Sequence, residues 1–152
     1  MPTAEVHEHI DCPPQDVFAY VTDPHRLPEW LNTVLEVQEV RPATFEQPGQ
    51  YISVSRFLGR RFNLTFRTVL GAQPLTILAE TSAGPVPHSW HYTFTPEGSG
   101  TRIKLIIEAE PTSFFSLAAP LALNLLQRQV QTDLHTVKHL LEAARMASAS
   151  PV

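Results

Sequence analysis

The segment 126-LQRQVQTDLHTVKHLLEAA-144 has the pattern of one long amphipathic helix. Its apolar residues recur at steps of three and four, which places them on one face of an α-helix, and the polar residues fall elsewhere on the helical wheel. The apolar face consists of Leu126, Val130, Leu134, Val137, Leu141 and Ala144. Such a face has to be buried against another apolar surface, which the preceding residues must supply.

Residues 34–109 have the pattern of short β-strands, in which apolar and polar side chains alternate and turn-forming Gly and Pro separate the runs. Because the links are short, we expect an antiparallel sheet with one apolar face. The strands, including one before this region, are predicted at residues 4–10, 34–41, 50–58, 61–70, 75–82, 88–95 and 100–109. The clearest apolar parity is that of Phe62, Leu64, Phe66, Trp90, Tyr92, Phe94, Ile103, Leu105 and Ile107.

Proline-containing starts predict two short helices after the first strand. Pro13-Pro14 begins one of them and Asp23-Pro24 begins a second segment that ends at Trp30, because proline in a first helical turn loses no hydrogen bond. Pro120 follows Phe114-Phe115. It either kinks one helix or opens the long helix after a short preceding one.

The order of these elements predicts an α+β helix-grip fold. A curved antiparallel sheet of about seven strands wraps around the long C-terminal helix, with the two short helices after the first strand. We expect residues 1–147 to form a single domain and residues 148–152 to form a frayed C-terminal tail. A curved sheet and a straight helix do not match in shape along their whole length, so a cavity is expected between them.

The composition excludes several classes of function. The 11 Lys and Arg residues are scattered against 15 Asp and Glu, apart from Arg60-Arg61, which argues against nucleic-acid binding. Cys12 is the single cysteine, so no internal disulfide is possible and a reducing compartment fits best. The first residues lack a signal-peptide pattern, and no apolar run is long enough to form a transmembrane segment. We therefore expect a cytoplasmic protein.

Three motifs resemble a known superfamily. The segment 11-DCPPQDVFAYVTDPHRLPEW-30 is similar to the start of SRPBCC proteins, which include START domains and the polyketide cyclase/dehydrase and lipid-transport proteins. The motifs 100-GTRI-103 and 138-KHLLE-142 agree with it. The resemblance implies the helix-grip fold over nearly the whole chain. Because such proteins include carriers, cyclases and dehydratases, it implies a fold more specifically than a reaction.

Large apolar and aromatic side chains of the predicted sheet face and helix are expected to line the cavity, which would suit an apolar or aromatic guest. Some of them, Trp30 among them, are equally compatible with plain core packing. The predicted lining comprises Trp30, Phe57, Phe62, Leu64, Phe66, Ile77, His88, Trp90, Tyr92, Leu105, Ile107, Leu121 and Leu125.

Polar residues near this face are candidates for proton transfer or for hydrogen bonding to a ligand. His88 shares parity with Trp90, so it lies either in the cavity mouth or on the rim, and histidine titrates near neutral pH, as a general acid or base should. The alternation leaves open whether Tyr51, Ser53 and Ser55 face inward, where their hydroxyls would orient a ligand carbonyl.

Charged and metal-binding candidates are weaker. Arg56 and Arg67 either pair with an acidic ligand group or are simply solvated. His135 and His139 are one helical turn apart, but Thr136 stands where a zincin motif has Glu. We expect no metal and no cofactor.

Three functions are compatible with these patterns. The leading hypothesis is that a monomer or homodimer carries or sequesters a small hydrophobic ligand, such as a lipid or an aromatic polyketide-like molecule. The first alternative is a polyketide cyclase, aromatase or dehydratase in which His88, Tyr51 or Tyr92 moves protons. The second alternative is a protein-interaction module.

Overall fold

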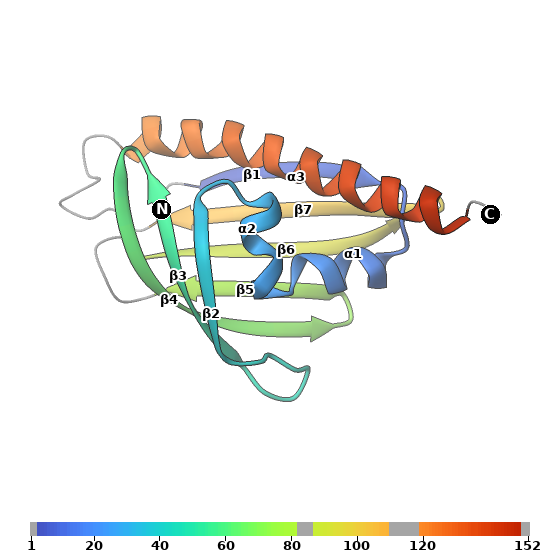
Figure 1. Cartoon of the computed structure of the whole chain (residues 1–152), viewed down its shortest axis with the longest axis horizontal. Coiled ribbons are helices and arrows are strands. Elements are labelled where there is room, and N and C mark those ends of the chain that lie inside the picture. Colours follow the sequence, from blue (N-terminus) through green and yellow to red (C-terminus); the bar gives the residue numbers. More distant parts are fainter. Residues whose placement is uncertain (1–2, 82–86, 110–118, 150–152) are drawn as a thin grey trace.

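The computed structural model describes residues 3–81, 87–109 and 119–149. One strand and three short helical segments precede six further strands, and one long helix follows them (Figure 1). In chain order the elements are β1 (Thr3–Ile10), α1 (Pro14–Val21), the 3-10 helix η1 (Pro24–Arg26), α2 (Leu27–Trp30), β2 (Val34–Arg41), β3 (Gly49–Phe57), β4 (Arg60–Ala72), β5 (Leu75–Thr81), β6 (His88–Glu97), β7 (Gly100–Ala109) and α3 (Ala119–Ala149).

The strands form a seven-stranded sheet in the order β1-β7-β6-β5-β4-β3-β2, and every neighbouring pair is antiparallel. Figure 1 shows β2 and β3 crossing the direction of β5, β6 and β7 at a steep angle, with the long β4 bending between them. The sheet is therefore strongly twisted and curved, as a helix-grip fold requires. Helix α3 extends along one side of it.

The sequence-based expectations for the fold are confirmed. Each predicted strand is present, with bounds that differ by at most two residues. Pro120 is the second residue of α3, so it opens the long helix. A short helix before it would lie outside the described residues. Ser148, predicted to belong to a frayed tail, is still helical because α3 continues to Ala149.

The connection between β3 and β4 is a tight two-residue turn. Leu58 and Gly59 are its two central residues, and both have positive φ, at 53° and 74°. Two consecutive positive φ values define the turn whose twist matches that of the flanking strands. Gly59 adopts this conformation without cost, whereas Leu58 is strained.

Helix α3 is tied to the edge strand β1 by side chains that donate hydrogen bonds to backbone carbonyl groups. We call these contacts the β1–α3 seam. Because β1 is an edge strand, such bonds satisfy carbonyl groups that no neighbouring strand pairs. The seam pairs, 2.9–3.0 Å apart, are Gln127 Nε2–Glu5 O, Gln131 Nε2–His7 O and Lys138 Nζ–His9 O.

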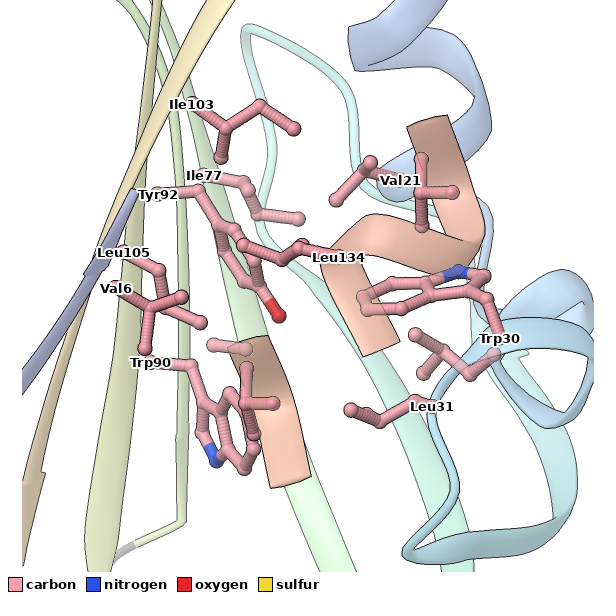
Figure 2. Close-up of a cluster of buried hydrophobic side chains, with 14 of the residues drawn as sticks. Val6, Val21, Trp30, Leu31, Ile77, Trp90, Tyr92, Ile103, Leu105 and Leu134 are labelled. Atoms are coloured by element: carbon pink, nitrogen blue, oxygen red, sulfur yellow. The ribbon is translucent and has the colours of Figure 1, made fainter. Parts of the chain in front are cut away.

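The main core lies between the sheet and the middle of α3. Val130, Leu134 and Val137 are fully buried on the helix, as the predicted apolar face requires, while Ala144 near the C-terminal end is exposed. In Figure 2, Val6 and Leu105 point from the sheet toward Leu134. None of the described helices is long and apolar enough to span a membrane.

Candidate ligand-binding cavity

A cavity lies between the sheet, the segment from α1 to β2, and the first turns of α3. It offers about 120 Å³ to the centres of water-sized molecules, well above the ~10–15 Å³ that one water needs. Most of its wall is apolar. The expected gap between sheet and helix is thus present at one end of the molecule.

Small side chains explain why the space is not filled. In the antiparallel register, Trp90 on β6 lies opposite Ala79 on β5, and Ala79 lies opposite Thr68 on β4. Ala79 and Thr68 border the cavity from the sheet, and Ala122 borders it from α3. Because the sheet and the helix both carry short side chains here, these positions leave the space between them unfilled.

Most side chains predicted to line the cavity do border it. They come from the five consecutive strands β3, β4, β5, β6 and β7. Those of the prediction that border the cavity are Phe57, Phe62, Leu64, Phe66, Ile77, His88, Trp90, Tyr92 and Ile107.

Four predicted lining residues lie elsewhere. Trp30 and Leu105 are 3 % and 0 % exposed in the core and do not border the cavity. Leu121 and Leu125 are 63 % and 41 % exposed. The residues of α3 that border the cavity in their place are Ala122, Leu123 and Leu126. The start of α3 is apolar on more than one side, so its hydrophobic pattern did not determine which side faces the sheet.

An aromatic row crosses the sheet beneath the cavity. Tyr51 stacks on Phe66 with ring centroids 5.2 Å apart, and Phe66 meets His88 edge-on at 5.5 Å. The ring centroids of His88 and Trp90 are 6.1 Å apart. These packed rings fix each other's orientation and present flat apolar surfaces to the cavity.

The question left open for β3 is answered by its pairing with β4. Tyr51, Ser53 and Ser55 pair with Phe66, Leu64 and Phe62 in register, and directly opposite residues share a face of the sheet. All three therefore face inward and border the cavity. The Ser53 and Ser55 hydroxyls share a hydrogen bond of 3.1 Å. The apolar parity of β4 was the signal that could have oriented β3.

The two tyrosines of the wall keep their protons. Burial raises the pKa of Tyr51 above its ordinary value of 10.0. Burial also raises the pKa of Tyr92, and the nearby Tyr51 and Asp133 add to that shift. Both side chains are thus neutral hydrogen-bonding groups rather than phenolates near neutral pH.

The arginines considered as ligand partners point away from the cavity. Arg56 is exposed, and Arg67 pairs with Glu80 at 3.5 Å on the solvent side of the sheet. The described residues that border the cavity include no Asp, Glu, Lys or Arg. Its polar groups are hydroxyls, backbone atoms, the His88 imidazole and the Trp90 indole.

Asp133 is a buried carboxylate that the sequence reasoning missed. It is 3 % exposed on α3. It accepts a hydrogen bond from the backbone N–H of Asn32 at 3.2 Å and one from Gln129 Nε2 at 2.9 Å. Burial nevertheless raises its pKa above the ordinary value of 3.8. Its position between Val130 and Val137 on the apolar helix face was the available signal.

The histidine pair lies outside this cavity. His135 contacts His139 with ring centroids 4.5 Å apart, and its Nδ1 lies 3.2 Å from Glu8 Oε2 on β1. Across residues 3–81, 87–109 and 119–149, no group of three or more His, Cys, Asp or Glu side chains is arranged to hold a metal ion. The pair belongs to the exposed contact between α3 and β1.

Several solved structures share this fold, and some of them are biosynthetic proteins. TTHA0849 from Thermus thermophilus has 23 % identity and a TM-score of 0.81, over 94 % of this chain and 99 % of that one. The Zhui aromatase/cyclase from Streptomyces sp. R1128 has 14 % identity and a TM-score of 0.75, over 99 % of both chains. The di-domain aromatase/cyclase StfQ of the steffimycin biosynthetic pathway has 14 % identity and a TM-score of 0.72, over 94 % of this chain and 51 % of that one.

Sequence comparison gives the family. No curated protein matches the chain significantly. The family model for polyketide cyclase / dehydrase and lipid transport matches residues 1–142. This family and fold are consistent with hydrophobic-ligand binding or with polyketide cyclase-type roles. The chain therefore belongs to the polyketide cyclase / dehydrase and lipid transport family, within the START-like SRPBCC superfamily that its sequence motifs resemble.

Proposed function

We propose that the protein binds a small hydrophobic molecule in the cavity between the sheet and α3, and carries or sequesters it. The observation that supports this most directly is the cavity itself, a mostly apolar space bordered by the packed aromatic rings of the sheet. A solid core would be more stable, because every unfilled space removes dispersion contacts from its lining. Retaining the space therefore favours a binding role.

Native mass spectrometry of the purified protein, followed by organic extraction, tests this proposal. Ala122→Leu places a larger side chain in the cavity and should abolish any co-purified mass. The matched control is Ala143→Leu on an exposed position of the same helix, which should retain the mass. Failure of both the wild-type protein and the control to retain any hydrophobic molecule, or to bind an added uncharged fluorophore, would contradict the proposal.

A second candidate is a cyclase-type enzyme, and one observation favours it. The His88 imidazole and the Tyr51 and Tyr92 phenols border the same apolar space. An imidazole can accept a proton near neutral pH, and a neutral phenol can donate a hydrogen bond to a developing enolate. With a verified ketone substrate, His88→Ala should reduce kcat by about 100-fold or more. Unchanged turnover in this variant and in both Tyr→Phe variants would exclude these roles.

A further inference from the structure

The cavity wall makes a charged ligand unfavourable. No carboxylate, ammonium or guanidinium group borders it among the described residues, so an ionised guest would lose its hydration without gaining a partner. Arg56 and Arg67 lie on the opposite parity of their strands. The buried Asp133 does not border the cavity and accepts hydrogen bonds from Asn32 and Gln129. The ligand that this wall accommodates is therefore uncharged.

The wall does, however, contain hydrogen-bond donors that lack a partner. Among the described residues, neither the Tyr51 nor the Tyr92 hydroxyl takes part in a hydrogen bond, and the buried Trp90 Nε1 has none either. Trp90 is 7 % exposed. A buried donor without an acceptor is costly, so donors are normally satisfied. No water-sized group reaches the enclosed Trp90 Nε1, so the two phenols are the donors left for a group that arrives with the ligand.

Packing holds the two phenols in fixed directions. The Tyr51 ring is stacked on Phe66 at an interplanar angle of 16°, and the Tyr92 ring is stacked on Phe94 at 17°. In Figure 2 the Tyr92 hydroxyl points from the sheet into the space between sheet and helix. Tyr51 borders the same cavity from β3. Both phenols are thus part of the wall of one cavity.

The wall also contains smaller hydroxyls. Ser53 and Ser55 share one hydrogen bond, and Thr22, Thr33 and Thr68 border the cavity as well. The phenols are the donors that packed rings hold in place, and a phenol kept neutral by burial donates readily. The ligand group that matches this set is an acceptor with two lone pairs and no proton of its own.

We propose that the cavity selects an uncharged molecule with a flat apolar body and a carbonyl oxygen, and that Tyr51 and Tyr92 donate hydrogen bonds to that oxygen. This inference rests on the proposed binding function. The aromatic row of Tyr51, Phe66, His88 and Trp90 supplies the flat surface, and the phenols supply the polar anchor. A pure hydrocarbon of the same size would contact the flat surface but could not accept a hydrogen bond from the phenols. A carboxylate of the same size would lose its hydration without gaining a charged partner.

Three probes of one skeleton test the assignment by titration calorimetry or fluorescence: naphthalene, 2-acetylnaphthalene and 2-naphthoate. The wild-type protein should bind the ketone about tenfold more tightly than naphthalene and should bind the carboxylate most weakly. Tyr51→Phe and Tyr92→Phe should each weaken ketone binding about three- to tenfold while leaving naphthalene unchanged. The matched control is Tyr20→Phe, since Tyr20 lies on α1 and bonds to Glu29 outside the cavity.

The outcomes separate this inference from the binding function itself. Equal binding of naphthalene and the ketone, unaffected by either Tyr→Phe change, would overturn the carbonyl assignment and leave hydrophobic binding intact. Preferential binding of 2-naphthoate would overturn the uncharged class. If none of the three probes bound to the folded wild-type protein, the cavity would not be a ligand site. Thermal unfolding of each variant shows that lost affinity is not lost folding.

Discussion

Leu64 and Leu105 allow cavity lining to be distinguished from core packing. Both are inward-facing leucines of the same sheet, and they are 6 % and 0 % exposed. Leu105 lies in the core beneath α3 (Figure 2) and does not border the cavity, whereas Leu64 does. Truncating each to alanine removes the same atoms. The two variants should therefore differ only because of what surrounds the atoms that are removed.

The expected magnitudes follow from that difference. Leu105→Ala should lower the free energy of unfolding by about 3–5 kcal/mol, because a new void opens in a filled core. Leu64→Ala should lower it by about 2 kcal/mol or less, since part of the Leu64 side chain faces an existing space and has fewer contacts to lose. In urea, with a slope of about 2 kcal/mol/M, the midpoint should fall by about 1.5–2.5 M for Leu105→Ala and by about 1 M or less for Leu64→Ala.

Binding provides the second measurement. Leu64→Ala enlarges the cavity, so the affinity for the larger uncharged fluorophore N-phenyl-1-naphthylamine should rise relative to that for naphthalene. Leu105→Ala should leave this ratio unchanged in the folded fraction. Equal destabilisation by the two substitutions, with no effect of either on the ratio, would refute the reasoning, because Leu64 would then be packed as tightly as the core.

Three further predictions concern Asp133, the β1–α3 seam and Gly100. Burial raises the pKa of Asp133, so the folded protein holds a proton on this carboxyl group more tightly than the unfolded chain does, and the wild type loses stability as the pH rises above about 4. Asp133→Asn should therefore gain stability relative to the wild type between about pH 4 and pH 7. A difference in urea unfolding that does not depend on pH would contradict this. The double change Gln127→Ala and Gln131→Ala should cost about 1–2 kcal/mol of unfolding free energy, and no shift in midpoint would show that water replaces these bonds fully. A Cβ at Gly100 would collide with the Ile10 backbone carbonyl oxygen, so Gly100→Ala should destabilise by about 1–3 kcal/mol, whereas a neutral change in melting temperature would mean that the β1–β7 edge can shift.

Strand and helix periodicity predicted most of this fold because each element has one buried face. The alternation at Trp90 and Tyr92 and the spacing of Val130 and Val137 correspond directly to burial. What periodicity could not predict was which of several apolar residues faces the sheet when a helix turn is apolar on more than one side. That is why Leu121 was assigned to the wall although its side chain is exposed.

The cavity depends on properties that one strand or helix does not reveal. Ala79 and Ala122 leave space only because they border the same cavity from different elements, and Tyr51 faces inward because β3 pairs with β4 in a particular register. Sequence spacing encodes neither relation. Family resemblance indicated that a cavity exists, but the identity of its polar groups required the pairing of neighbouring strands.

Contacts outside the cavity stabilise the fold, and they let the protein keep a costly site. Phe18 meets Phe94 at 5.4 Å beneath α1, and the seam and Val130 hold the middle of α3. The unfilled space, the unpartnered phenols and Trp90 lie toward the first turns of the same helix. Each of these features lowers stability on its own. Because part of the core lies outside the wall, substitutions in the wall should change ligand choice at a smaller cost in stability than substitutions in the filled core.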